Sequence, residues 1–160
     1  MEKVDYRKTF KKIYIPGTSP EITEIPSFRF AAMEGEGDPN SDEFAEATGA
    51  LYSFSYAVKM SYKSKDAPSG YYDYTVFPLE GVWDLVDRTK SVEDKNNYKY
   101  TIMIRQPDFL TDELFERFIS KLKKKKPQFC FDRIRYITVT EGECCQMMHL
   151  GSYESERKSF

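Results

Sequence analysis

Several residue types are scarce in this chain of 160 residues. It has three cysteines, one histidine and one tryptophan, and the 24 Lys and Arg nearly balance the 26 Asp and Glu. Cys130, Cys144 and Cys145 are an odd number, and none of them shows metal-ligand spacing with His149. We therefore expect a reduced, cytoplasmic chain with no structural metal and no cofactor.

The chain also lacks a charge excess and long hydrophobic runs. Its formal net charge of -2 gives no global field that favours nucleic acid or an anionic membrane. The N-terminal stretch "MEKVDYRKTFKKIYIPG" has no apolar core of a signal peptide, and the longest uncharged apolar runs are far too short to span a bilayer. The sequence thus predicts no direct nucleic-acid binding, no export and no membrane insertion.

Aromatic residues, by contrast, are plentiful. They make up 16% of a chain whose length fits a single domain, and this excess is the one compositional indication of a binding site. Residues 1–26 include "IPGTSPEITEIP", whose prolines and glycine disfavour a regular central element, so we expect an extended N-terminal leader. The remaining residues, 27–160, are expected to form the domain.

Hydrophobic periodicity predicts the elements of this domain. "SFRFAAMEGEG" alternates as a half-buried strand does, and residues 41–60, after a cap at Asn40, carry one apolar stripe typical of a helix. Tyr52 and Tyr56 form a second, aromatic ridge on that helix. Residues 74–87 and 98–105 are predicted to form an antiparallel hairpin with a charged tip.

The second half of the chain repeats part of this order. Residues 111–126 predict a helix with Thr111 as its cap and lysines in its last turn. "IRYITVTEG" and "ECCQMMHLGSY" are predicted to be strands that meet at "EG", and Ser152 is a candidate cap for a final helical turn. The order β-α-β-β-α-β-β indicates an α+β fold.

The stretch "YTVFPLEGVWDLVD" raises a specific question. Strict alternation places Glu80 and Trp83 on opposite faces of a strand, but a bulge at Gly81 would bring them to one face. Glu80 is then either an exposed carboxylate beside a core tryptophan or part of a site. Alternation alone favours the first interpretation.

Several segments together resemble one family. "EGEGDPN", "LYSFSYAVKM", "YTVFPLEGVW", "MIRQPDF" and "EGECCQMMHLGSYESE" are similar to motifs of the GyrI-like small-molecule-binding domains, in particular the stand-alone bacterial members with "PLEGLW" and "HxGxYxxE". The resemblance runs from about residue 5 to the end. It implies a bacterial transcription-effector-binding fold: an antiparallel sheet with helices on one face, built from two β-α-β-β units. It also implies that the second unit is incomplete here, because a complete member would continue past Phe160.

The resemblance further implies a function. Such domains bind bulky aromatic or cationic compounds in a cleft with an aromatic cage and an acidic residue, and some members hydrolyse cyclopropane-bearing DNA-alkylating compounds. On this basis we expect a bulge at Gly81, Glu80 as general base and the Tyr153 hydroxyl as donor. The expected ligand contacts are Trp83, Tyr52, Tyr56 and Glu156.

Other interpretations stay open at this point. Tyr52 and Tyr56 are equally explained by helix packing, Glu156 by the helix dipole, and His149 by a hydrogen-bonded packing role. The domain is either a hydrolase, a non-catalytic module that sequesters or senses a ligand, or a protein-interaction module of the topoisomerase-inhibiting kind. Exposed apolar sheet and helix faces would also promote self-association.

Overall fold

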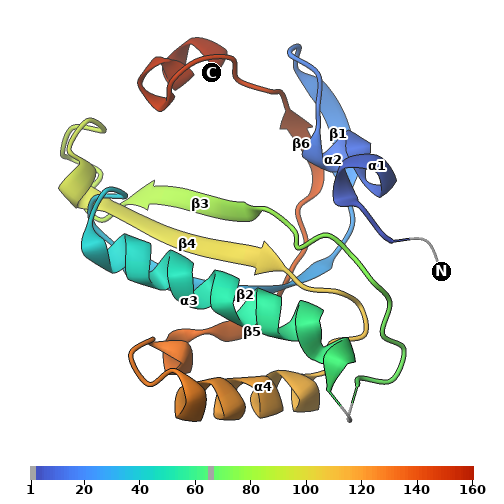
Figure 1. Ribbon diagram of the computed structural model, residues 1–160. Coiled ribbons are helices and arrows are strands. Elements are labelled where there is room, and N and C mark those ends of the chain that lie inside the picture. Colours follow the sequence, from blue (N-terminus) through green and yellow to red (C-terminus); the bar gives the residue numbers. More distant parts are fainter. Residues whose placement is uncertain (1–2, 65–66) are drawn as a thin grey trace.

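A computed structural model describes residues 3–64 and 67–160. Its central element is a four-stranded antiparallel sheet in the order β3-β4-β2-β5, and two long helices cover one face of this sheet (Figure 1). The strands are β2 (Phe28–Glu36), β3 (Leu79–Leu85), β4 (Tyr98–Arg105) and β5 (Arg135–Val139), and the helices are α3 (Asp42–Lys59) and α4 (Asp112–Lys125). The predicted α+β fold is confirmed.

A second, two-stranded sheet stands above one end of the first (Figure 1). In it β1 (Glu21–Ile25) pairs antiparallel with β6 (Gly142–Gln146). Two short helices, α1 (Tyr6–Thr9) and α2 (Lys11–Tyr14), lie beside this pair. Residues 3–26 are therefore less extended than predicted, since they form α1, α2 and β1. The prolines Pro20 and Pro26 flank β1 and do not interrupt it.

The two strands predicted after α4 are present, but they do not pair with each other. β5 joins the large sheet beside β2, whereas β6 leaves that sheet and pairs with β1. The chain changes direction at Gly142, whose φ of 67° lies in the left-handed region that glycine adopts most readily. "EG" is thus a turn between two sheets.

Helix caps follow the predicted chemistry, with one shift. The Thr111 hydroxyl accepts a hydrogen bond from the Leu114 amide at 3.2 Å, as expected. For α3, however, Ser41 accepts from the Phe44 amide at 3.2 Å, and Asn40 donates to Asp38. The cap therefore lies one residue after the predicted one.

Four short 3₁₀ segments complete the chain: η1 (Met60–Lys63), η2 (Lys95–Asn97), η3 (Phe131–Arg133) and η4 (Tyr153–Ser159). The last of them is the turn predicted after Ser152. His149 holds it through contacts of 2.7 Å from Nδ1 to the Ser159 hydroxyl and 3.0 Å from Nε2 to the Ser155 hydroxyl. The hydrogen-bonded packing role of this histidine is confirmed.

The two faces of the large sheet pack against different parts of the chain. On the helix side, residues of alternating positions such as Met33 and Ile102 pack with Leu51 and Phe54 of α3 in the main core. On the other side, which we call the open face, Phe30, Ala32 and Met103 form a smaller buried cluster. The helices leave this open face free for a site.

A close approach on the helix side yields a stability test. A Cβ at Gly35 would lie 2.5 Å from the Tyr100 ring, so Gly35→Ala must displace that ring. We expect a loss of about 1–3 kcal/mol in the free energy of unfolding, measured by urea denaturation. Gly17→Ala is the matched control, because its nearest contact would be an ordinary 3.9 Å, and it should change stability by less than about 0.5 kcal/mol.

Candidate functional site

The pairing of β3 with β4 decides where Glu80 and Trp83 lie. The register runs without interruption from the pair Leu79 and Ile104 to the pair Leu85 and Tyr98. Glu80 is opposite Met103 on the open face, whereas Trp83 is opposite Tyr100 on the helix side. The predicted bulge at Gly81 is therefore wrong, and so is the shared face for Glu80 and Trp83.

Gly81 has another physical explanation. A Cβ at this position would lie 2.7 Å from Nε1 of Trp83, so the indole occupies the space beside the glycine. The Trp83 ring stacks on Phe44 with 5.8 Å between ring centroids, and its centroid lies 5.2 Å from that of Tyr100. These contacts leave Trp83 45% exposed at the edge strand, on the opposite side of the sheet from Glu80.

Glu80 lines a cavity of about 260 Å³ on the open face. Four separate parts of the chain enclose it: the leader, β2, β3 and the segment from the end of β5 into β6. The lining residues are Ile13, Tyr14, Ile25, Pro26, Phe28, Phe30, Glu80, Val139, Glu141 and Gln146. The leader therefore forms one wall of the cavity.

Hydrogen bonds and ring contacts hold this wall in place. The Gln146 side chain of β6 donates to the carbonyl of Lys12 at 2.6 Å, which ties α2 to the small sheet. The Tyr14 ring contacts Tyr6 and Phe77, with centroid separations of 5.2 and 5.7 Å. The Tyr14 hydroxyl is thereby positioned at the cavity.

The electrostatics of the cavity centre on Glu80. Burial, the largest cause, and the nearby charge of Glu141 together raise the pKa of this carboxyl to about 7, although the Tyr14 hydroxyl and the charge of Arg105 act in the opposite direction. Burial also raises the pKa of Tyr14, and the charge of Glu80 adds to this effect. Near neutral pH the cavity thus holds a carboxyl able to take or give a proton beside a neutral phenol.

A buried cation supports this arrangement. Arg105 is only 5% exposed, and its guanidinium carbon lies 3.5 Å from the ring centroid of Phe28 and 4.2 Å from that of Phe10. Among the described residues its Nη1 atom has no hydrogen-bond partner. Aromatic faces therefore stabilise a positive charge close to the Glu80 carboxyl.

Sequence reasoning missed Tyr14, Arg105 and Glu141. A signal existed for Arg105, since alternation places it on the same face of β4 as Met103, which pairs with Glu80. Tyr14 and Glu141 lie in segments whose position depends on the pairing of β1 with β6, and no local pattern indicates that pairing.

The other residues expected at the site are not brought to Glu80. Tyr52 packs partly buried against the main core, and Tyr56 is 53% exposed on α3, which covers the helix side. Tyr153 is 93% exposed and Glu156 is also exposed, both in η4. An ion pair of 3.3 Å between Arg157 and Glu93 places η4 against the connection between β3 and β4. Ligand contact by these four residues stays a prediction.

Within residues 3–64 and 67–160, no cluster of three or more His, Cys, Asp or Glu side chains is arranged to hold a metal ion. No helix in the same residues is both long and apolar enough to cross a membrane.

The raised pKa of Glu80 predicts a pH-dependent stability. The carboxyl has a folded-state pKa of about 7 against a usual value of 4.5. The protonated carboxyl therefore contributes fully to the free energy of unfolding below about pH 4.5, and this contribution is lost as the pH rises through 7. The Glu80→Gln side chain is neutral at all pH values and does not have this loss. The difference in the free energy of unfolding, variant minus parent, should therefore be about 1–3 kcal/mol larger at pH 8 than at pH 5. Urea unfolding at both pH values measures this difference. The control is Glu143→Gln, because the Glu143 side chain on β6 is exposed. An equal effect of Glu80→Gln at both pH values would contradict the assignment.

Comparisons with known proteins agree with this fold. The profile of the GyrI-like small molecule binding domain matches residues 18–160. A crystal structure of a hydrolase from Listeria innocua has a TM-score of 0.88 and 35% identity, covering 98% of this chain and 79% of that one. An uncharacterized conserved protein from the same organism has a TM-score of 0.92 and 36% identity, with 98% and 76% coverage. A search of curated proteins finds no match. The chain therefore belongs to the GyrI-like family of small-molecule-binding domains.

Proposed function

We propose that this domain binds a bulky aromatic or cationic compound at the Glu80 cavity and hydrolyses it. Cyclopropane-bearing alkylating compounds are the proposed substrate class. The observation that carries the proposal is a carboxyl group with a pKa of about 7 in an aromatic-lined cavity, since a general base works best when its pKa is near the working pH. The structural similarity to a hydrolase from Listeria innocua supports the reaction type.

The cavity size indicates how such a ligand lies. Its volume of about 260 Å³ is just below the ~300–1,000 Å³ of typical ligand sites, so it admits only part of a bulky compound. The remainder would lie along the open face, where Val82 of β3 is 58% exposed on the same face as Glu80. The reacting part of the ligand is thus the part that enters beside Glu80.

The proposed reaction adds water across one cyclopropane bond that is conjugated to a carbonyl. Glu80 removes a proton from water while the water oxygen attacks the ring carbon, the carbon–carbon bond breaks, and its electron pair moves to the carbonyl oxygen as an enolate. Protonated Glu80 then returns the proton to that oxygen. The carboxylate is regenerated, and the product differs from the substrate by one water molecule.

Tyr14 takes the donor role in this proposal. Its hydroxyl interacts with Glu80 in the cavity, and its raised pKa keeps it neutral, so it can donate a hydrogen bond to the developing oxyanion. The sequence assigned this role to Tyr153, which is almost fully exposed. Comparing the turnover of the Tyr14→Phe and Tyr153→Phe variants therefore tests which hydroxyl is the donor.

Substitutions separate catalysis from binding. With a cyclopropane-bearing alkylator as substrate, Glu80→Gln should abolish formation of the hydrated product, measured by mass spectrometry, while ligand binding measured by calorimetry is largely retained. Tyr14→Phe should slow turnover about 10- to 100-fold, and Tyr153→Phe should leave it unchanged. The reverse order of the two tyrosines would return the donor role to Tyr153.

Two other outcomes would contradict hydrolysis and identify another class. Stoichiometric binding that leaves the compound unchanged would indicate a sequestering or sensing module, whose carboxylate pairs with a cationic ligand. In that case a cationic dye should release a proton from Glu80 on binding at pH 6.5. A protein partner recovered by pull-down, with no effect of any such compound on the melting temperature, would indicate an interaction module.

A further inference from the structure

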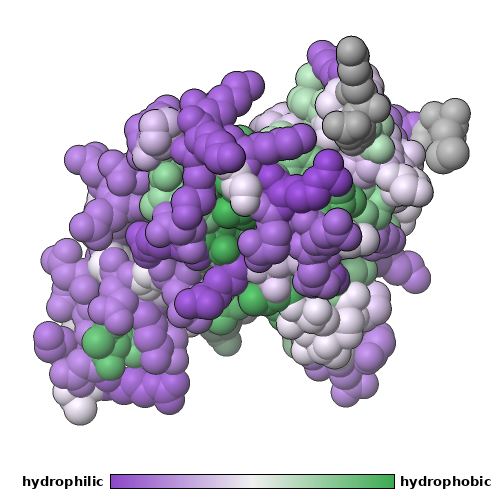
Figure 2. Space-filling model, turned by 90° about the horizontal axis from the view of Figure 1, so that it is seen from below, coloured by the Kyte–Doolittle hydropathy of each residue, from purple (hydrophilic) through white to green (hydrophobic). Residues whose placement is uncertain are grey.

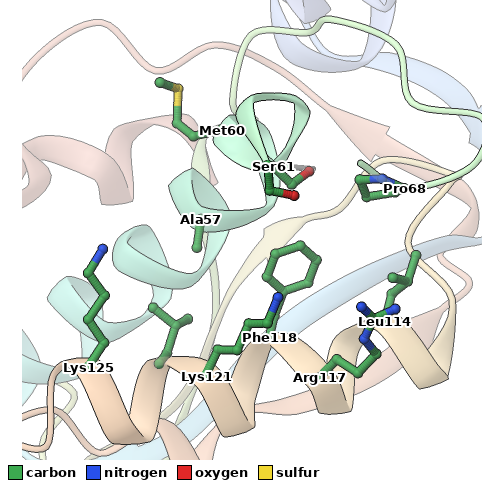
Figure 3. Close-up of a pocket in the computed structure, with 11 residues that line it drawn as sticks. Ala57, Met60, Ser61, Pro68, Leu114, Arg117, Phe118, Lys121 and Lys125 are labelled. Atoms are coloured by element: carbon green, nitrogen blue, oxygen red, sulfur yellow. The ribbon is translucent and has the colours of Figure 1, made fainter. Parts of the chain in front are cut away.

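A second cavity lies between α3 and α4, in the layer on the other side of the sheet from Glu80. It has a volume of about 320 Å³ and a largely apolar lining, which includes Ala57 of α3, Met60 of η1, and Leu114 and Phe118 of α4. Figure 3 shows the Phe118 ring directed from α4 toward the end of α3 and η1. We call this cavity the interhelix groove.

Cationic side chains border the groove along α4. Arg117, Lys121 and Lys125 recur every four residues, which places them on one side of the helix, and all three line the groove (Figure 3). Within residues 3–64 and 67–160 none of them forms an ion pair, and no acidic residue among them lines the groove. As far as the described residues show, the border of the groove is therefore cationic, and its floor is apolar.

The size of the apolar area limits the kind of ligand. Seen from below α4, the surface is mostly hydrophilic, and hydrophobic residues show only in small areas between charged side chains (Figure 2). The core of a stable protein interface is depleted in charged residues, whereas charged side chains surround these hydrophobic areas. The groove instead suits a small ligand.

We propose that the interhelix groove binds an amphipathic anion. The apolar body of this ligand, an alkyl chain or a small aryl group, lies against Ala57, Leu114 and Phe118. Its carboxylate, sulfonate or phosphate lies against Arg117 and Lys121. Arg117 and Lys121, which the Glu80 site does not use, thereby gain a role independent of the proposed hydrolysis.

The test uses decanoate as the probe with the full chain. We expect binding with a Kd of about 0.1–1 mM by calorimetry, accompanied by amide shifts in α4. Decyltrimethylammonium has the same chain length and the opposite charge, and it could also enter the Glu80 cavity. Its binding at the groove is therefore measured by the amide shifts in α4 and should be at least about tenfold weaker than that of decanoate. Decanoate should still bind Glu80→Gln with unchanged affinity, so failure of the Glu80 proposal and failure of this one are distinguishable.

Matched variants locate the anion. Arg117→Gln with Lys121→Gln should weaken decanoate binding about tenfold, whereas Lys123→Gln with Lys124→Gln removes the same charge from residues that do not line the groove and should change it less than twofold. Ala57→Leu should fill the floor and weaken binding, with circular dichroism confirming the fold. Equal losses in the two charge variants, equal shifts of the α4 amides with the cationic probe, or no binding of decanoate below its micelle concentration would each overturn the proposal.

Discussion

The uninterrupted register between β3 and β4 is the constraint on which the rest of the structure depends. It sends Trp83 to the helix side, where Phe44 and Tyr100 contact its ring, and Glu80 to the open face beside Met103. A slip of one residue would exchange these faces and bury the carboxylate in the main core without a partner, which is costly. The contacts of Trp83 on the helix side therefore fix the orientation of Glu80 on the open face.

The environment of Glu80, in contrast, is built from distant parts of the chain. Its desolvation requires the wall formed by Ile13 and Tyr14, and this wall requires β1 to pair with β6, more than 110 residues away. The antiparallel backbone bonds of that pair and the bond from Gln146 to Lys12 hold the leader over the open face. Loss of this pairing would expose Glu80 to water and return its pKa toward the ordinary value. The leader thus acts on the chemistry of the site as well as on its shape.

Local pattern predicted the elements of the large sheet and its helices, but it predicted neither α1, α2 and β1 nor the pairing of β5 and β6. The period of α4 and its Thr111 cap could be predicted because each is encoded within a few neighbouring residues. Alternation identified β2 as a strand but not as one buried on both faces from Phe30 to Met33, because that burial depends on distant segments. The pairing of β5 and β6 could not, because alternation identifies a strand but not the strand beside it. For the same reason Glu80 could be identified as a candidate, whereas its true neighbours Tyr14 and Glu141 could not. Gly81 misled prediction because a glycine in a strand is compatible both with a bulge and with a close side chain, here the Trp83 indole.

The two cavities differ in the sign of the charge around them. Glu80 and Glu141 make the open-face cavity favourable for cations, and the buried charge of Arg105, held by aromatic rings, opposes the rise in the pKa of Glu80. Arg117, Lys121 and Lys125 make the interhelix groove favourable for anions. If both proposals hold, the sheet separates a site that prefers cations from one that prefers anions. Helix α3 packs its core face on the sheet and lines the groove with Ala57. A ligand in the groove would therefore contact the helix that packs on the face of the sheet opposite Glu80.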